Sequence, residues 1–259
     1  MMKPNILIKQ FPDGESYMRV RNLRALKNKN VTIYKRFHPE PEKNIFELLL
    51  SLSVIKKATS KISVLVPYLS YARQDRENKT GEAVSADVLC GILKNFGVKK
   101  LITYDCHFLP RPGKFIRVGL RIENRSAKKI LLDYAKKYFR NKEFTVISPD
   151  QGAAYLSHQA LHKTRKDHKI HKIEGEVNVK GRNVCILDDI IASGGTILKA
   201  IKHLKKLGAK RIIVGAVHGV FALPDIVRKI EKNCDLLFVT DSIPTKDRRL
   251  KILKLPRAV

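Results

Sequence analysis

Residues Val184 to Lys199 read VCILDDIIASGGTILK. The first four are apolar, as in a buried strand, and the stretch from Thr196 onward begins an amphipathic segment that is typical of a helix. Between them stand two adjacent aspartates and a Ser-Gly-Gly-Thr turn. A glycine-containing turn at a helix N-terminus exposes backbone N–H groups to an anion. This stretch therefore predicts a strand-turn-helix unit whose turn binds a phosphate group.

The two aspartates narrow down the ligand. A carboxylate repels a phosphate but accepts hydrogen bonds from neutral hydroxyls, so a sugar phosphate suits both halves of the stretch. A helix cap needs only one such residue, and the GxxxxGK[ST] spacing of another phosphate-binding loop is absent. We expect the sugar hydroxyls on Asp188 and Asp189, and the phosphate on Ser193, Gly194, Gly195 and Thr196.

The same strand-then-helix pattern extends along the chain in both directions. Apolar, β-branched runs occupy residues 31–37, 62–68, 99–105, 144–148, 182–189, 210–219 and 235–241. Longer amphipathic segments, expected to be helices, follow at residues 44–58, 83–97, 125–139, 152–163, 195–209 and 223–233. Such alternation predicts an α/β fold with mostly parallel sheets, whose ligands bind at the carboxyl ends of the strands.

Two segments interrupt this alternation. Residues 111–120, RPGKFIRVGL, contain Pro and Gly and show no clear period, so we divide the chain there into domains of residues 1–119 and 120–259. Residues 163–179, KTRKDHKIHKIEGEVNV, are too polar for a core strand. We expect them to form a projecting hairpin or flap.

The net charge of +28 is the unusual feature of the composition, since 52 basic residues face 24 acidic ones. It indicates an anionic partner without identifying it. The lysines are spread over helix faces rather than collected in one arm, and the aromatic residues occur singly, so we judge nucleic acid an unlikely partner.

Cysteine usage and hydropathy indicate the compartment. The four cysteines, Cys90, Cys106, Cys185 and Cys234, are far apart and flanked by apolar residues, which predicts buried thiols rather than disulfides or metal ligands. No run approaches the roughly 18 apolar residues of a membrane span, and MMKPNILIKQ lacks the apolar core of a signal peptide. We therefore expect a cytoplasmic protein without membrane contact.

Four further motifs accompany the opening stretch. They are FPDGE at residues 11–15, PYLSYARQDR at 67–76, TYDCH at 103–107 and SPDQGA at 148–153. In this order, together with residues 188–196, they resemble the motifs of phosphoribosyl pyrophosphate synthetases. The sugar-phosphate stretch alone also resembles type I phosphoribosyltransferases, which have no counterpart to the first three motifs. The resemblance implies two phosphoribosyltransferase-like domains.

The resemblance also implies roles for individual residues. In the ATP site it places Phe11, Asp13, Glu15, Arg73, Gln74, Asp75 and Arg76. The forked cation of Arg73 and the amide of Gln74 suit a polyphosphate and a purine edge. The FPDGE loop is implied to reach a neighbouring subunit's ATP site, which predicts a homodimer or larger homo-oligomer. The resemblance also implies that Asp150, Gln151, Gly152 and Ala153 form the diphosphate loop and that His107 and Asp150 bind Mg²⁺. It further implies that the flap carries the catalytic cations Lys163 and Arg165.

The implied reaction is transfer of the β,γ-diphosphoryl group of MgATP to O1 of ribose 5-phosphate, giving phosphoribosyl pyrophosphate and AMP. Two alternatives share part of the pattern: a type I phosphoribosyltransferase that consumes this product, and a non-catalytic regulatory subunit. The chain departs from the family at Ala192, where relatives usually carry a polar residue. It also has no counterpart to the family's strand and helix before FPDGE or to its closing helix, which leaves subunit packing and nucleotide regulation open.

Overall fold

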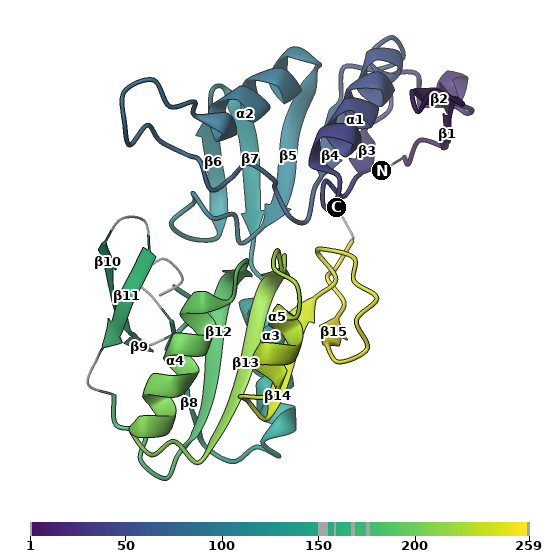
Figure 1. Cartoon of the computed structure of the whole chain (residues 1–259). Coiled ribbons are helices and arrows are strands. Elements are labelled where there is room, and N and C mark those ends of the chain that lie inside the picture. Colours follow the sequence, from purple (N-terminus) through teal and green to yellow (C-terminus); the bar gives the residue numbers. More distant parts are fainter. Residues whose placement is uncertain (1, 150–154, 158, 167–168, 175–176, 258–259) are drawn as a thin grey trace. The chain divides into compact units, whose positions relative to one another are not determined.

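The computed structural model describes residues 2–149, 155–157, 159–166, 169–174 and 177–257. It divides into two compact units, unit 1 with Met1–Arg125 and Pro256–Val259, and unit 2 with Ser126–Leu255 (Figure 1). The division falls a few residues beyond the boundary drawn after residue 119. The reason is that strand β7, Leu120–Arg125, pairs with β5 and β6 of unit 1.

The central sheet of unit 1 has five strands in the order β3-β4-β5-β7-β6. Their bounds are β3 Val31–Tyr34, β4 Ile62–Leu65, β5 Val98–Tyr104 and β6 Gly113–Arg117, with β7 as above. All pair in parallel except β6, which is antiparallel to β7. Parallel pairing brings the carboxyl ends of β3, β4 and β5 to one edge, where the segments after residues 34, 65 and 104 emerge.

Helices and a separate hairpin complete unit 1. Helices α1, Pro41–Ile55, and α2, Ser85–Asn95, flank the sheet, and the 3-10 turn η1 spans Leu23–Leu26. Each helix has a run of buried residues that joins the unit's apolar core, as the amphipathic pattern predicts. Strands β1, Ile6–Gln10, and β2, Ser16–Val20, form an antiparallel pair of their own.

Unit 2 is built on six strands in the order β15-β14-β13-β12-β8-β9, all parallel. They are β8 Phe144–Ser148, β9 Gln159–Ala160, β12 Asn183–Ile191, β13 Arg211–Gly219, β14 Leu236–Thr240 and β15 Lys251–Leu253. The central strands β12 and β13 are almost continuously buried, as expected for a sheet covered on both faces. Helices α3 Lys128–Tyr138, α4 Gly195–Lys206 and α5 Ile226–Glu231 flank the sheet (Figure 1).

A second hairpin leaves unit 2 between β9 and β12. Strands β10, His162–Lys166, and β11, Lys169–Glu174, pair antiparallel with a register shift between Thr164 and Arg165. The hairpin expected for residues 163–179 is thus present. The helix predicted over residues 152–163 is not: the described residues there form a short turn at 155–156, then β9 and the start of β10. Leu161 explains the difference, because its N–H donates to the Ser148 carbonyl while its side chain is fully buried.

The α/β class and the two mostly parallel sheets flanked by helices are confirmed. The cysteines are free thiols, three buried and Cys234 half-buried, and burial raises the pKa of Cys90 to about 11. Across the described residues, no helix has the length and apolar character needed to span a membrane.

Candidate functional site

The paired aspartates lie within strand β12, which runs on to Ile191. Asp188 pairs in register with Ala216 of β13, and the strand continues two residues beyond the run at 182–189 that the sequence predicted. Both side chains are only 6% exposed. Each carboxylate accepts the next backbone N–H: Asp189 N donates to Asp188 Oδ1 at 2.9 Å, and Ile190 N to Asp189 Oδ1 at 2.8 Å. These bonds orient both carboxylates at the carboxyl end of the sheet.

The turn after β12 places a helix N-terminus beside these aspartates. Gly194 caps α4 in the left-handed conformation, with φ of 73°, and no side chain caps the helix. The first N–H groups of a helix have no partner within it, so the N-terminus of α4 offers donors and a positive dipole end. Ser193 is exposed and Thr196 half-buried. The expected sugar-phosphate residues are therefore brought together on one segment.

The two glycines of the turn play different roles. A Cβ on Gly194 would lie 2.5 Å from Ile226 Cγ1 and 2.6 Å from its Cδ1, so the packing of α5 against the turn excludes a side chain. Gly195 has an ordinary backbone conformation. The nearest atom to a Cβ added there would be Ser193 Oγ, at 3.9 Å. Only Gly194 is required by the fold itself.

A buried polar network that the motifs did not indicate lies next to this edge. His218, 1% exposed at the end of β13, has its Nδ1 2.9 Å from Ser242 Oγ. Ser242 Oγ also donates to the Val217 carbonyl at 3.0 Å, and Thr240 Oγ1 donates to the same carbonyl at 2.6 Å. Since a serine hydroxyl has one proton, both contacts are hydrogen bonds only when His218 Nδ1 carries a proton and donates.

The sequence contains one signal of this network, which is that polar residues directly follow the apolar runs of β13 and β14. The runs RIIVGAV and DLLFV are followed directly by His218 and by Thr240-Asp241-Ser242. Asp241 fixes the chain beyond them, because its Oδ1 accepts the Leu255 N–H at 2.8 Å and its own N–H donates to the Leu253 carbonyl at 2.8 Å.

In unit 1 the segment after β4 carries the YARQDR motif at the carboxyl edge. Tyr71 has a left-handed backbone with φ of 66°, and its hydroxyl bonds the carboxylate of Glu42. This bond holds the pKa of Glu42 below its ordinary value. Gln74 is anchored twice, since its side-chain oxygen accepts from Ser85 Oγ and its carbonyl accepts from Ala86 N at 3.2 Å. The loop is thereby tied to the start of both helices.

The remaining motif residues differ in their exposure. Arg73 and Arg76 are exposed, and Asp75 is half-buried with an Oδ1 3.6 Å from Arg76 Nε. The Asp75 carbonyl accepts from Arg117 Nη2 at 2.6 Å, and Arg117 also pairs with Asp87 of α2. Arg73 thus projects from a braced loop, as a phosphate-binding side chain should.

His107 follows β5 at the same edge of unit 1 and is exposed. The turn before it is fixed by two bonds: Asp105 N donates to the Arg125 carbonyl at 2.8 Å, and Cys106 N donates to Asn124 Oδ1 at 3.0 Å. Asp105 is fully buried with φ of 37°. The buried turn therefore presents the imidazole outward.

The FPDGE motif forms the tip of the β1–β2 hairpin, and all five of its residues are exposed. Gly14, with φ of 94°, and the 2.8 Å bond from Phe11 N to the Glu15 carbonyl close the turn. Asp13 Oδ1 accepts the Glu15 N–H at 3.0 Å. Phe11 is 49% exposed and meets Tyr17 edge-on at 5.9 Å between centroids. An exposed aromatic ring on a rigid turn is available to stack on a planar ligand.

Some predicted residues lie partly or wholly outside the described structure. Asp150, Gln151, Gly152 and Ala153 are not described, so neither the diphosphate loop nor the predicted His107 and Asp150 metal pair is tested. Lys163 and Arg165 lie on β10, for which the backbone alone is described. Within the described residues no group of three His, Cys, Asp or Glu side chains is arranged to hold a metal ion.

Comparison with known proteins accounts for both units. The family model described as the N-terminal domain of ribose phosphate pyrophosphokinase matches residues 2–97, and the phosphoribosyl transferase domain model matches residues 157–243. The chain is thus of the phosphoribosyltransferase-fold class, with the fold in unit 2 and a synthetase-type N-terminal domain before it.

Relatives and a solved structure cover nearly the whole chain. It is 34% identical to the ribose-phosphate pyrophosphokinases of Thermococcus kodakarensis and Pyrococcus abyssi, over 95% and 96% of this chain and 88% of each relative. The crystal structure of phosphoribosylpyrophosphate synthetase from Mycobacterium smegmatis aligns with a TM-score of 0.78 and 25% identity, over 97% of this chain and 86% of that one. The chain belongs to the ribose-phosphate pyrophosphokinase family, which is a family of enzymes.

Proposed function

We propose that this chain transfers the diphosphoryl group of MgATP to ribose 5-phosphate. The observation that carries the proposal is the carboxyl edge of unit 2, where two buried, oriented aspartates precede a glycine turn and an uncapped helix N-terminus. Hydroxyl acceptors beside phosphate donors match a sugar phosphate. Family membership supplies the second substrate, ATP.

We assign the sugar to Asp188 and Asp189 and its 5-phosphate to residues 193–196. The nucleotide is assigned to the exposed cations and amide of the YARQDR loop, and to Phe11 and the acidic residues of the FPDGE turn of a neighbouring subunit. The β,γ-diphosphate is assigned to Asp150 and the three residues after it. The motif order and the bracing of the Gln74 loop support this division.

In the proposed reaction O1 of ribose 5-phosphate forms a bond to the β-phosphorus of ATP as the bond from that phosphorus to the bridging oxygen of AMP breaks. The O1 proton leaves to solvent, and no covalent bond to the enzyme forms. Catalysis then consists of positioning and charge stabilisation. Lys163 and Arg165 on the β10–β11 hairpin are assigned to the negative charge that develops on the transferred group.

Mg²⁺ bound with the nucleotide would offset phosphate charge. A single exposed imidazole, His107, fits a site in which magnesium keeps most of its shell as water and phosphate oxygens, and Asp150 would be the oxygen ligand. The nucleotide and sugar-phosphate substrates also support the proposed cytoplasmic location.

The test is to incubate the protein with ATP, Mg²⁺ and ribose 5-phosphate and to measure AMP and phosphoribosyl pyrophosphate together. Equal amounts of both products are expected. Consumption of phosphoribosyl pyrophosphate would instead identify a phosphoribosyltransferase, and no turnover under varied Mg²⁺ and phosphate would indicate a regulatory subunit.

The hairpin assignment has its own test. Lys163→Ala should lower turnover by about 10² to 10³, the effect of losing one preorganised donor to transition-state charge, with little change in the KM for ribose 5-phosphate. Lys169→Ala, on the opposite strand of the hairpin, is the matched control and should retain turnover. Equal turnover of Lys163→Ala and wild type would remove this residue from the mechanism.

A further inference from the structure

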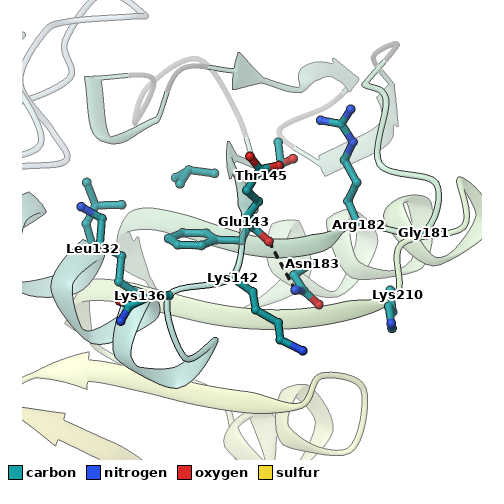
Figure 2. Close-up of a pocket in the computed structure, with 12 residues that line it drawn as sticks. Leu132, Lys136, Lys142, Glu143, Thr145, Gly181, Arg182, Asn183 and Lys210 are labelled. Atoms are coloured by element: carbon teal, nitrogen blue, oxygen red, sulfur yellow. Dashed lines mark hydrogen bonds between the residues drawn. The ribbon is translucent and has the colours of Figure 1, made fainter.

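A cleft of about 770 Å³ lies in unit 2 at the amino ends of strands β8 and β12 (Figure 2). Its walls come from the end of helix α3, the loop at residues 141–143, the segment at 181–183 and Lys210 before β13. This is the opposite end of the sheet from the aspartates. Asp188 follows Asn183 by five residue steps along β12, roughly 17 Å at the rise of a strand, so the cleft is distinct from the sugar-phosphate site.

Four cations line the cleft: Lys136, Lys142, Arg182 and Lys210. All four are exposed, and within the part of the chain that the structure describes their side chains form neither ion pairs nor hydrogen bonds. Glu143 is the one carboxylate in the lining. Four cations against one carboxylate give this hollow a net positive potential among the described residues.

Neighbouring loops extend this positive end of the unit. Lys210 N donates to the Arg182 carbonyl and Gly181 N to the Gly208 carbonyl, both at 2.8 Å, which ties the segment before β12 to the one before β13. Further exposed cations stand on these loops and on the last turns of α3 and α4: Lys137, Arg140, Lys180, Lys205, Lys206 and Arg211. Of these, Arg211 is neutralised in part by Asp235, 3.7 Å from its Nε.

The cleft is not lined by charge alone. Leu132, Phe144 and Val146 are half-buried and form apolar wall, while Asn183 Nδ2 donates to the Glu143 carbonyl at 3.3 Å. The ring of Phe144 packs against Phe139 at 5.2 Å between centroids. A single-strand nucleic-acid site combines cations that follow the phosphate backbone with an aromatic side chain on which a base can stack. The cleft contains both elements. A cleft of this volume admits a base but not a duplex.

We propose that this cleft, flanked by the exposed cations around it, binds single-stranded nucleic acid, with phosphates on the four lining cations and a base against Phe144. The proposal departs from the expectation drawn from the sequence, because folding gathers at this cleft lysines and arginines that are scattered along the chain. The proposal does not rest on the diphosphokinase function, and it gives part of the +28 charge a role.

The test measures binding of the whole protein to short oligouridylate and oligothymidylate by fluorescence anisotropy over a range of salt concentrations. A fourfold variant, Lys136→Ala, Lys142→Ala, Arg182→Ala and Lys210→Ala, is compared with a control that loses the same charge in unit 1. The control is Lys27→Ala, Lys29→Ala, Lys57→Ala and Lys99→Ala, all exposed lysines. The ratio of the dissociation constants for the two oligomers shows whether RNA or DNA is preferred.

Each phosphate contact contributes about 0.7 to the slope of log affinity against log salt for single strands. The cleft variant should therefore lose up to about 2.8 from this slope and bind at least about tenfold more weakly at low salt, while the control stays near wild type. A thiouridine-containing oligomer should crosslink to the peptide that contains Phe144. Turnover and melting temperature of the cleft variant should match wild type.

Three results would overturn the proposal. They are absence of binding at low salt, equal losses in the two variants, and crosslinks confined to residues outside the cleft. A free nucleotide that competes as well as the oligomer would show that the cleft holds a small anion and not a strand.

Discussion

At the scale of single residues, the two glycines of the turn after β12 have different roles. The fold requires Gly194, and the proposed phosphate site requires Gly195. Gly194 has a left-handed backbone and no room for a Cβ beside Ile226. Gly194→Ala should therefore destabilise unit 2 by at least about 1–2 kcal/mol, which thermal denaturation would detect as a lower Tm.

Gly195→Ala should keep the Tm and raise the KM for ribose 5-phosphate, because its Cβ would enter the space of the bound phosphate. A normal KM for Gly195→Ala would contradict the phosphate assignment.

Ser242 is a second residue with a testable role, which depends on its hydroxyl. It accepts from His218 and donates to the Val217 carbonyl, with all three groups buried. Ser242→Ala leaves the His218 N–H without this partner, at a cost of about 1–3 kcal/mol in the free energy of unfolding. Chemical denaturation measures the loss. Thr245→Ala, which removes a half-buried acceptor of the Asp247 N–H, is the control and should lose less. Equal losses would mean that the network adds no stability of its own.

At the scale of elements, Glu123 joins two neighbouring strands of unit 1. It lies on β7, with Oε2 3.0 Å from Lys100 Nζ on β5 and Oε1 2.8 Å from Arg125 Nε. Burial raises the pKa of Glu123, but the hydrogen bonds from Arg125 and Lys100 more than offset it and hold the pKa below its ordinary value. The folded state thus keeps the carboxylate ionised to lower pH than the unfolded state does.

The stabilisation by Glu123 should therefore be present above the unfolded pKa and be lost as the pH falls through the lowered folded value. Glu123→Gln should reduce the free energy of unfolding by about 1 kcal/mol at neutral pH, and by less in acid. Urea denaturation at several pH values measures both. The exposed Glu231→Gln is the control and should lose less free energy of unfolding at neutral pH. A loss for Glu123→Gln that stays constant into acid would exclude the ion pairs as its cause.

The sequence predicted elements well where one periodicity ran through a whole segment, as in β12 followed by α4. It was ambiguous where the turn chemistry was unusual. Residues 111–120 showed no period, yet β6 and β7 form a hairpin whose turn has positive φ at both Val118 and Gly119. A β-branched residue rarely adopts that conformation, so the turn could not be read from residue type. The supposed helix at 152–163 failed because Leu161 is needed beside β8.

The candidate site was predictable to the extent that motifs mark strand ends. Asp188, Asp189 and the glycine turn are where they were expected, at the carboxyl edge of unit 2. His218 and Ser242 were missed because each is a single polar residue after an apolar run, and only the parallel pairing of β12, β13 and β14 brings them beside the aspartates. Non-local pairing of this kind leaves no local pattern in the sequence.

At the scale of the whole molecule, unit 1 taken by itself exposes apolar surface among its described residues. A hollow of about 350 Å³ is lined by Ile45, Tyr71, Val88 and Ile92 among others, from helices α1 and α2 and the YARQDR loop. Of these lining residues, Val88 is 56% exposed and Tyr71 is 38% exposed. Exposed apolar residues that cluster around a hollow are typical of a protein–protein contact. This surface supports the proposed homo-oligomer, in which a second copy would cover α1 and α2.

The oligomer proposal predicts that a charge in this hollow separates the subunits. Val88→Asp should lower the mass found by sedimentation equilibrium, because an unpaired carboxylate buried in an apolar contact is strongly unfavourable. Its turnover should fall as well if the FPDGE turn serves a neighbour's ATP site, and should recover at high protein concentration. Ile116→Asp, on β6 outside the hollow and 74% exposed, is the matched control and should leave mass and turnover unchanged. If wild type sediments as a monomer with full activity, both the covered surface and the shared ATP site are refuted.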